Sequence, residues 1–190
     1  MATEVDEALY DSLEAGDPDA VRRALAAGAD PDGEHYNESP LTFLCRHAAR
    51  GDTFVATEGT SPGDPVACLA ALLEYGASPN VVKNPVNARD SEGTTPLAES
   101  INENQMGGAD ISCVYSVLLR AGATLPPYVP DDEGDEEDPY LRKVRRAGGF
   151  PQYEAQVTKS LAAIFEPKFP KLPAEVIPTI VAFWAHVGDY

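Results

Sequence analysis

The thiols are the most reactive side chains in this sequence, and they belong to Cys45, Cys68 and Cys113. A thiol can act as a nucleophile or as a zinc ligand where it is accessible and easily deprotonated. These three stand among Leu and Ala in helical patterns and form no CxxC pair. Their surroundings therefore predict small buried hydrophobic side chains in a reducing compartment, and neither a disulfide framework nor a zinc site.

The histidines could supply acid–base catalysis or metal ligands. They are His35, His47 and His186, and none has another histidine or a carboxylate four residues away, the spacing that places two ligands on one helix face. The phosphate-binding motifs GxGxxG and GxxxxGK are absent. The sequence thus predicts no catalytic residue, no metal site and no cofactor. An enzyme with an unrecognised site remains as an alternative.

The charge of the chain limits its partners. The 190 residues include 14 Lys and Arg against 31 Asp and Glu, which gives a formal net charge of −17. Such a charge repels nucleic acid and anionic membranes and leaves another protein as the expected partner. The acidic first residues and the lack of an apolar run of about 18 residues predict neither a signal peptide nor a membrane span. We expect a cytoplasmic or nuclear protein.

One sequence motif occurs three times, and it indicates the helices that must position any functional side chain. Its copies are LAAGADPDG at 25–33, LEYGASPNV at 73–81 and LRAGATLPP at 119–127. Each copy follows an amphipathic helical pattern, and a second helical pattern precedes that one. The later helix of each pair begins after Asp17, Asp64 or Asp110, and a glycine that can adopt a left-handed conformation follows it. Helix pairs in tandem predict an all-α solenoid whose units share one continuous apolar core. The residues predicted for this core are Leu41, Leu44, Leu69, Leu72, Leu73, Leu97, Ile101, Val114, Val117 and Leu118.

These residues resemble the ankyrin-repeat family over about residues 4–125. The segment TTPLAES at 94–100 is similar to the TPLHxA motif of that family, and the GADP, GASPN and GAT turns close the units. Thr42 and Ala98 stand where the family usually has histidine. The resemblance implies a monomeric, non-catalytic module that binds a protein through its finger tips and its concave inner helices.

The units are longer than usual for this family. Gly28, Gly76 and Gly122 are further apart than the period of about 33 residues of ankyrin units, and the excess lies mainly in insertions at 51–64 and 81–93. Such insertions form surface loops that often carry function, although a surface loop also tolerates extra length at little cost. The resemblance places the binding residues in the first two fingers. They are His35, Tyr36, Asn37, Lys83, Asn84, Asn87 and Arg89.

The composition changes beyond the repeats. Residues 126–139 are rich in Pro and acid and predict a linker, and the basic stretch at 140–149 could either pair with these acids or stand apart from them. Of these two readings, independent charge clusters are favoured because exposed ion pairs contribute little. Residues 140–190 predict a C-terminal helical element with helices at 153–165 and 173–187.

The second of these helices is apolar on nearly all sides, so it must be covered on more than one side. Its start, LPAEV at 172–176, resembles the LPxE opening of F-box helices, which implies an adaptor subunit of a cullin-type ubiquitin ligase. Trp184 would then be a binding residue. The alternative is that the helix caps the solenoid, and the sequence favours this cap.

Overall fold

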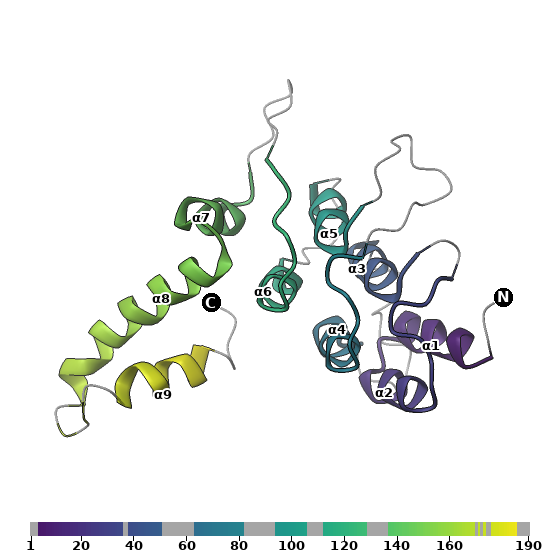
Figure 1. Ribbon diagram of the computed structural model, residues 1–190, viewed down its shortest axis with the longest axis horizontal. Helices are drawn as coiled ribbons and strands as arrows, with labels where there is room; N and C mark the ends of the chain where they lie inside the picture. Colours follow the sequence, from purple (N-terminus) through teal and green to yellow (C-terminus); the bar gives the residue numbers. More distant parts are fainter. Residues whose placement is uncertain are drawn as a thin grey trace. The chain divides into compact units, whose positions relative to one another are not determined.

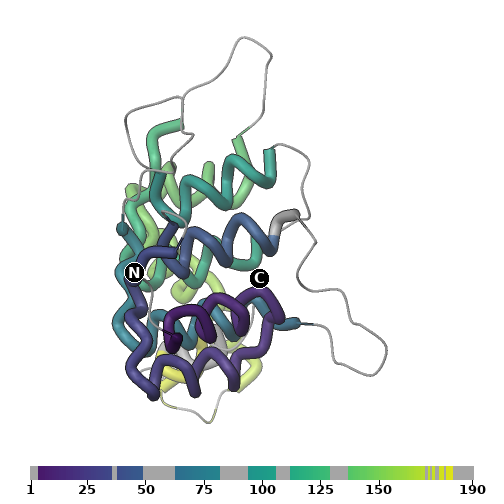
Figure 2. Tube along the Cα trace, turned by 90° about the vertical axis from the view of Figure 1, so that its right-hand side faces the viewer, coloured from purple at the N-terminus to yellow at the C-terminus, as the bar shows by residue number. Residues whose placement is uncertain are grey.

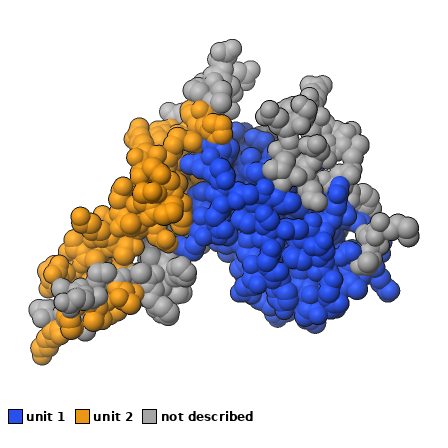
Figure 3. Space-filling model, in the orientation of Figure 1, with its two compact units in different colours: residues 1–126 blue, residues 127–190 orange. Residues whose placement is uncertain are grey.

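A computed structural model describes residues 4–35, 38–50, 63–81, 94–105, 112–128, 137–169, 171, 173 and 176–185. These residues form α-helices, one short 3-10 helix and an isolated β-bridge, with no β-strand among them, as the all-α prediction requires. The chain divides into two compact units, Met1–Pro126 and Pro127–Tyr190 (Figure 3). None of the described helices is both long enough and apolar enough to cross a membrane.

The first unit consists of three helix pairs stacked in two rows. Its helices are α1 (Glu4–Ala15), α2 (Pro18–Ala26), α3 (Pro40–Arg50), α4 (Pro65–Glu74), α5 (Pro96–Gln105) and α6 (Cys113–Arg120). Within each pair the two helices pack on each other, and α1, α3 and α5 form one row while α2, α4 and α6 form the other (Figure 1). Figure 2 shows the first row as roughly parallel rods, one above another. The predicted helix pairs are therefore present.

The starts of α2 and α4 follow the predicted capping pattern. The Asp17 carboxylate accepts the N–H groups of Asp19 and Ala20, the Asp64 carboxylate accepts that of Ala67, and proline follows each cap. These bonds satisfy N–H groups that have no partner inside the helix. The prediction for α6 was wrong, because that helix begins at Cys113 after Ser112, and Asp110 lies outside the described residues.

The ends of α2, α4 and α6 share one turn. Gly28, Gly76 and Gly122 have φ angles of 104°, 93° and 95°, a left-handed backbone that glycine adopts without strain. The alanine that follows each glycine donates its N–H to the helix carbonyl five residues back, as Ala77 does to Leu72 at 3.0 Å. This arrangement satisfies the last carbonyls of the helix and confirms the predicted glycine stop.

The same turns are joined to each other by side-chain hydrogen bonds. Asp32 accepts the N–H of Ser78 at 2.8 Å, and Asn80 accepts the N–H of Thr124 at 2.7 Å. Asp32 and Asn80 each stand four residues after the turn glycine, and Ser78 and Thr124 each stand two residues after the next one. Asn80 also donates to the carbonyl of Gly122 at 2.8 Å. We call this series of contacts the turn ladder.

The turn ladder begins with a different acceptor and ends where an acceptor is missing. In the first turn the N–H of Asp30, at the position of Ser78 and Thr124, donates to the carboxylate of Asp6 at 3.2 Å. In the third turn the position of Asp32 and Asn80 is taken by Pro126, whose side chain has no acceptor. The series therefore ends at the residue where the first compact unit ends.

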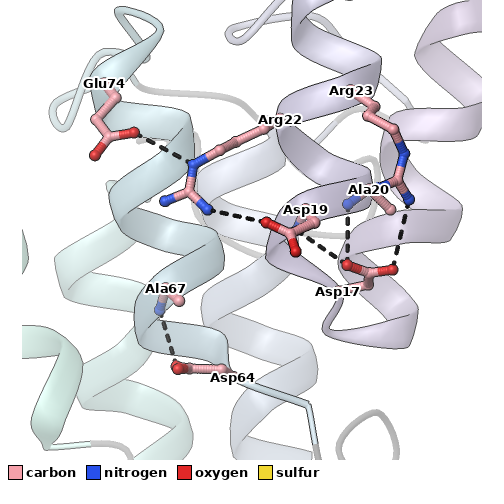
Figure 4. Close-up of polar contacts among 8 residues, drawn as sticks. All are labelled: Asp17, Asp19, Ala20, Arg22, Arg23, Asp64, Ala67 and Glu74. Carbon is pink, nitrogen blue, oxygen red and sulfur yellow. Dashed lines mark hydrogen bonds and ion pairs between the residues drawn. The ribbon is translucent and has the colours of Figure 1, made fainter.

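Two further contacts join the first and second helix pairs along the row of α2 and α4, and Figure 4 shows the one made by Arg22. The carbonyl of Gly16, before α2, accepts the N–H of Asp64, before α4, at 3.0 Å. Arg22 lies 3.6 Å from Asp19 and 3.5 Å from Glu74, so it bridges α2 and α4. Because these carboxylates are exposed, the ion pairs contribute about 0–1 kcal/mol each. The backbone contact and the turn ladder therefore do more to hold the pairs in register.

The core of the first unit lies between the two rows. Leu41, Leu44, Leu69, Leu72, Leu97, Val114 and Leu118 are buried as predicted. The predicted core membership of Leu73, Ile101 and Val117 was wrong, since all three are only half-buried. In α6 the buried side chains are instead Val114, Tyr115, Leu118 and Leu119. The face of α6 that packs on its neighbours is thus rotated from the predicted one.

The second unit contains α7 (Pro139–Ala147), α8 (Phe150–Phe165), the 3-10 helix η1 (Glu166–Lys168) and α9 (Val176–Ala185). Neighbouring helices pack along the chain, α7 on α8 and α8 on α9. Helix α7 was not predicted, although Asp138 caps it and Gly148, with φ 91°, ends it. The other two helices were predicted at 153–165 and 173–187, so α8 and α9 start earlier and later than expected, respectively, and residues 186 and 187 lie outside the described residues.

One acid of the linker, Glu137, pairs with the basic helix α7, so for this residue the favoured interpretation of independent charges was wrong; the acids at 131–136 lie outside the described residues. Glu137 is mostly buried, and its carboxylate lies 2.7 Å from Nε of Arg145 and 3.8 Å from Nε of Arg142. Arg142 also donates to the carbonyl of Glu137 at 3.0 Å. Shielding from water strengthens these ion pairs beyond the exposed case on which the prediction was based.

The turn ladder yields the first prediction. Replacement Asp32→Ala should lower the free energy of unfolding by about 1–3 kcal/mol, because the half-buried N–H of Ser78 loses its acceptor. The matched variant Asp32→Asn keeps an acceptor oxygen and should stay within about 0.5 kcal/mol of the wild type. Urea unfolding followed by circular dichroism measures both values. Equal stability of the two variants would contradict a structural role of this contact.

Candidate functional site

Most of the predicted binding residues lie outside the part of the chain that the structure describes. This holds for Tyr36, Asn37, Lys83, Asn84, Asn87 and Arg89, and for nearly all of the insertion at 51–64. Trp184 belongs to α9, but its side chain is not among those described. His35 is described, and the structure connects it to residues that the sequence did not indicate.

His35 lies at the base of the first finger, the segment between α2 and α3. It forms an isolated antiparallel bridge with Glu38, in which the two N–H groups donate to the partner's carbonyl at 3.2 and 3.1 Å. In the sequence Tyr36 and Asn37 stand between these two bridge residues. The bridge therefore fixes the two ends of the segment that carries the predicted contact residues.

The hydroxyl of Tyr10, in α1, forms hydrogen bonds with the backbone of this bridge. Its hydroxyl lies 2.7 Å from the carbonyl of Glu38 and 3.1 Å from that of Gly33, and it accepts the N–H of His35 at 3.3 Å. Tyr10 is buried, and this burial raises the pKa of its hydroxyl well above the ordinary value. A tyrosine hydroxyl is protonated at neutral pH in any case, so it can donate as well as accept.

A row of rings extends from the finger onto α3. The ring of Tyr10 lies 4.8 Å from that of His35 and 5.0 Å from that of Phe43, which it meets edge-on. Phe43 in turn stacks on His47 at 4.0 Å. Tyr10 is buried, whereas the other three rings are half-buried and so reach the surface. We call these four residues the finger-base cluster.

A nearly buried ion pair lies next to this cluster. The guanidinium of Arg46 contacts both carboxylate oxygens of Glu38, and Glu38 is only 4% exposed. Arg46 comes from α3 and Glu38 from the finger, so the pair ties these two segments together. Two-point pairing of this kind fixes orientation as well as distance.

The start of α3 is fixed by hydroxyl groups. The Ser39 hydroxyl lies 3.0 Å from that of Thr42, and it accepts the N–H of Thr42 at 3.2 Å. Both side chains are buried. Thr42, which stands where the resemblance expects histidine, thus still takes part in a hydrogen-bonded helix start.

Two of the thiols are buried as predicted. Cys45 and Cys68 lie in the core, and burial raises the pKa of each thiol to about 12. Thiols with such a pKa are protonated at neutral pH and are poor nucleophiles. Cys113 differs, since it is half-buried. Within the described residues no group of three His, Cys, Asp or Glu side chains could hold a metal ion.

The finger-base cluster depends on contacts that local sequence patterns do not reveal. Tyr10 and Glu38 are 28 residues apart in the chain. The spacing of Phe43 and His47, four residues apart on one helix, was the one signal available in the sequence for their stacking. No known family model and no curated protein matches the chain, so these comparisons assign it to no family.

The ion pair yields the second prediction. Replacement Arg46→Met should lower the free energy of unfolding by about 3–5 kcal/mol, since it leaves the Glu38 carboxylate buried without its counter-charge. The double variant Glu38→Gln/Arg46→Met removes both charges and should be more stable than the single variant. Denaturant unfolding measures both. A loss below about 0.5 kcal/mol for Arg46→Met would show that the pair does not hold the finger.

Proposed function

We propose that the chain is a non-catalytic module of the ankyrin-repeat type that binds a partner protein through its first finger and the adjoining face of α3. The repeat type is supported by three helix pairs in two rows, by Pro40 and Pro96 as the first residues of α3 and α5, and by the repeated glycine turns. In such solenoids each unit packs only on its neighbours, and the fingers and inner helices offer an extended surface.

The observation that carries the binding proposal is the finger-base cluster. Aromatic rings supply large contact areas at low entropic cost, and they are enriched where binding energy concentrates. His35, Phe43 and His47 reach the surface, while Tyr10 and the pair Glu38–Arg46 hold them in place from below. A surface that is already ordered before binding avoids the cost of ordering it in the complex.

The third prediction tests this surface. With the whole chain fused to a proximity-labelling enzyme, the double variant His35→Ala/His47→Ala should lose the labelled partner. With that partner purified, its Kd should rise about tenfold or more, the effect of losing a binding hot spot. The matched control is Tyr75→Ser, which removes an exposed aromatic ring at the end of α4.

Thermal melting of both variants shows whether the fold is retained. Undiminished capture by a folded His35→Ala/His47→Ala variant would contradict the proposal and move the site to the insertion at 51–64.

The variant Tyr36→Ala/Arg89→Ala tests the finger tips in the same assay. It should weaken capture with little change in the thermal midpoint.

A second candidate function is that of an adaptor subunit of a cullin-type ubiquitin ligase. The observation that favours it is the exposure of α9, where Val176 is 39% and Ile180 is 47% exposed while Ile177 and Val181 are buried. Val176 and Ile180 are four residues apart and share one helix face. They directly follow the LPAE segment that resembles an F-box opening. Within the second unit these two side chains are not covered, as a recruiting helix requires.

The fourth prediction separates these two roles of α9. If α9 recruits a ligase, the variant Val176→Ser/Ile180→Ser should lose binding to purified adaptor and cullin subunits and keep the thermal midpoint of the wild type. Trp184 fluorescence should then be red-shifted and freely quenched in the folded chain. Blue-shifted emission that is protected from quenchers, together with a lowered midpoint of the variant, would contradict recruitment and support a cap.

A further inference from the structure

The segments that form the finger-base cluster carry fixed charges of one sign. Neither α1 nor the first finger, residues 27–39, contains Lys or Arg. The acids of α1 are Glu4, Asp6, Glu7, Asp11 and Glu14. Arg46 of α3 lies next to the cluster, and the carboxylate of Glu38 balances its charge. A partner that approaches the cluster along α1 or the finger therefore meets carboxylates.

Three of these acids lie close to the hydroxyl of Tyr10, the residue that joins the cluster to α1. Asp6 stands about one helical turn before Tyr10, and its carboxylate accepts the N–H of Asp30. Glu34 is flanked by the two residues whose backbone groups hydrogen-bond to that hydroxyl. Burial raises the pKa of the Tyr10 hydroxyl most, and the charges of these three carboxylates raise it further, as close acids do. We call Asp6, Asp30 and Glu34 the acidic rim.

The acidic rim is accessible to a partner that contacts the rings. Asp30 and Glu34 are exposed, and Asp6 is half-buried, as are three of the four rings of the finger-base cluster. Protein interfaces commonly combine such an apolar centre with a polar edge. At physiological salt, exposed charges are screened beyond about 8 Å. A partner bound at the rings therefore responds to the rim rather than to the net charge of −17 of the whole chain.

We propose that the finger-base cluster and its acidic rim bind a basic segment of the partner protein. The rings contact apolar side chains of that segment and the methylene stems of its Lys and Arg residues, and the rim carboxylates pair with the charged ends. This inference rests on the proposed function, because it names the chemistry of the partner that binds the same site.

Two other occupants fit this surface less well. A second copy joined by a two-fold axis would set the same surface against itself and so bring one acidic rim close to the other. A nucleic acid would place its phosphates next to the rim carboxylates. Both arrangements bring like charges together, whereas a basic segment pairs with the rim.

The experiment uses the full chain and two labelled model peptides of equal length. Both carry Trp, Gly and Ser at the same positions, and the remaining positions are Lys in one peptide and Glu in the other. Fluorescence anisotropy should show saturable binding of the Lys peptide, with a Kd about tenfold or more below that of the Glu peptide. The variant His35→Ala/His47→Ala should weaken binding of the Lys peptide about tenfold, because it removes two of the rings.

Two neutralising variants separate the acidic rim from the total charge. Asp30→Asn/Glu34→Gln removes two rim charges, and its Asn keeps an oxygen that can accept the N–H of Asp32. This variant should raise the Kd of the Lys peptide about threefold to tenfold, the effect of losing two exposed ion pairs. The matched control Asp19→Asn/Glu74→Gln removes two exposed charges from the row of α2 and α4. It should bind the Lys peptide like the wild type.

Three outcomes would overturn the proposal. One is equal affinity of the wild type for the two peptides. Another is an equal loss of affinity in both neutralising variants, which would show a response to the total charge. The third is a dimer in sedimentation velocity that His35→Ala/His47→Ala abolishes, which would assign the surface to a second copy.

The proposed function fails by a different result. Undiminished partner capture by the folded His35→Ala/His47→Ala variant would contradict binding at the finger base, whatever the peptides show. Lost capture by that variant together with equal affinity for the two peptides would contradict only the basic partner.

Discussion

The turn ladder is the contact on which the arrangement of the first unit depends. Apolar burial depends on area more than on direction, so it sets the register of neighbouring helix pairs less sharply than directed contacts do. Hydrogen bonds from Asp32 to Ser78 and from Asn80 to Thr124 have a fixed length and direction, so they set the register of consecutive pairs. Asp6 begins this series and Pro126 ends it.

The ladder also positions the proposed binding surface and explains part of the acidic composition. Asp32 directly precedes Gly33, whose carbonyl contacts Tyr10, so the turn and the finger base form one continuous segment. Many of the acids have structural partners. Asp17, Asp64 and Asp138 cap helices, and Glu38 and Glu137 pair with arginines. Part of the negative charge thus serves the turns and the helix ends.

The features that were predicted correctly from the sequence are those that depend on the spacing of nearby residues. Helix pairs, glycine turns and the Asp–Pro starts of α2 and α4 follow from contacts within a few residues. The same Asp–Pro signal at Asp138 and Pro139 precedes α7, but the basic residues there were interpreted only as charges. The finger-base cluster and the turn ladder were not predicted, because their contacts, apart from the stacking of Phe43 on His47, join residues 23 to 46 positions apart. The burial of Tyr115 instead of Val117 likewise depends on how α6 packs on α4 and α5.

Hydrogen exchange of single amides tests the central claim most directly. In the native chain at neutral pH, NMR should show the N–H groups of Ser78 and Thr124 exchanging well below the rates of unstructured peptides, since both are held by side-chain acceptors. In Asp32→Ala the protection of Ser78 should fall while that of Thr124 remains. Exchange of both amides at unstructured-peptide rates in the folded wild-type chain would contradict the account.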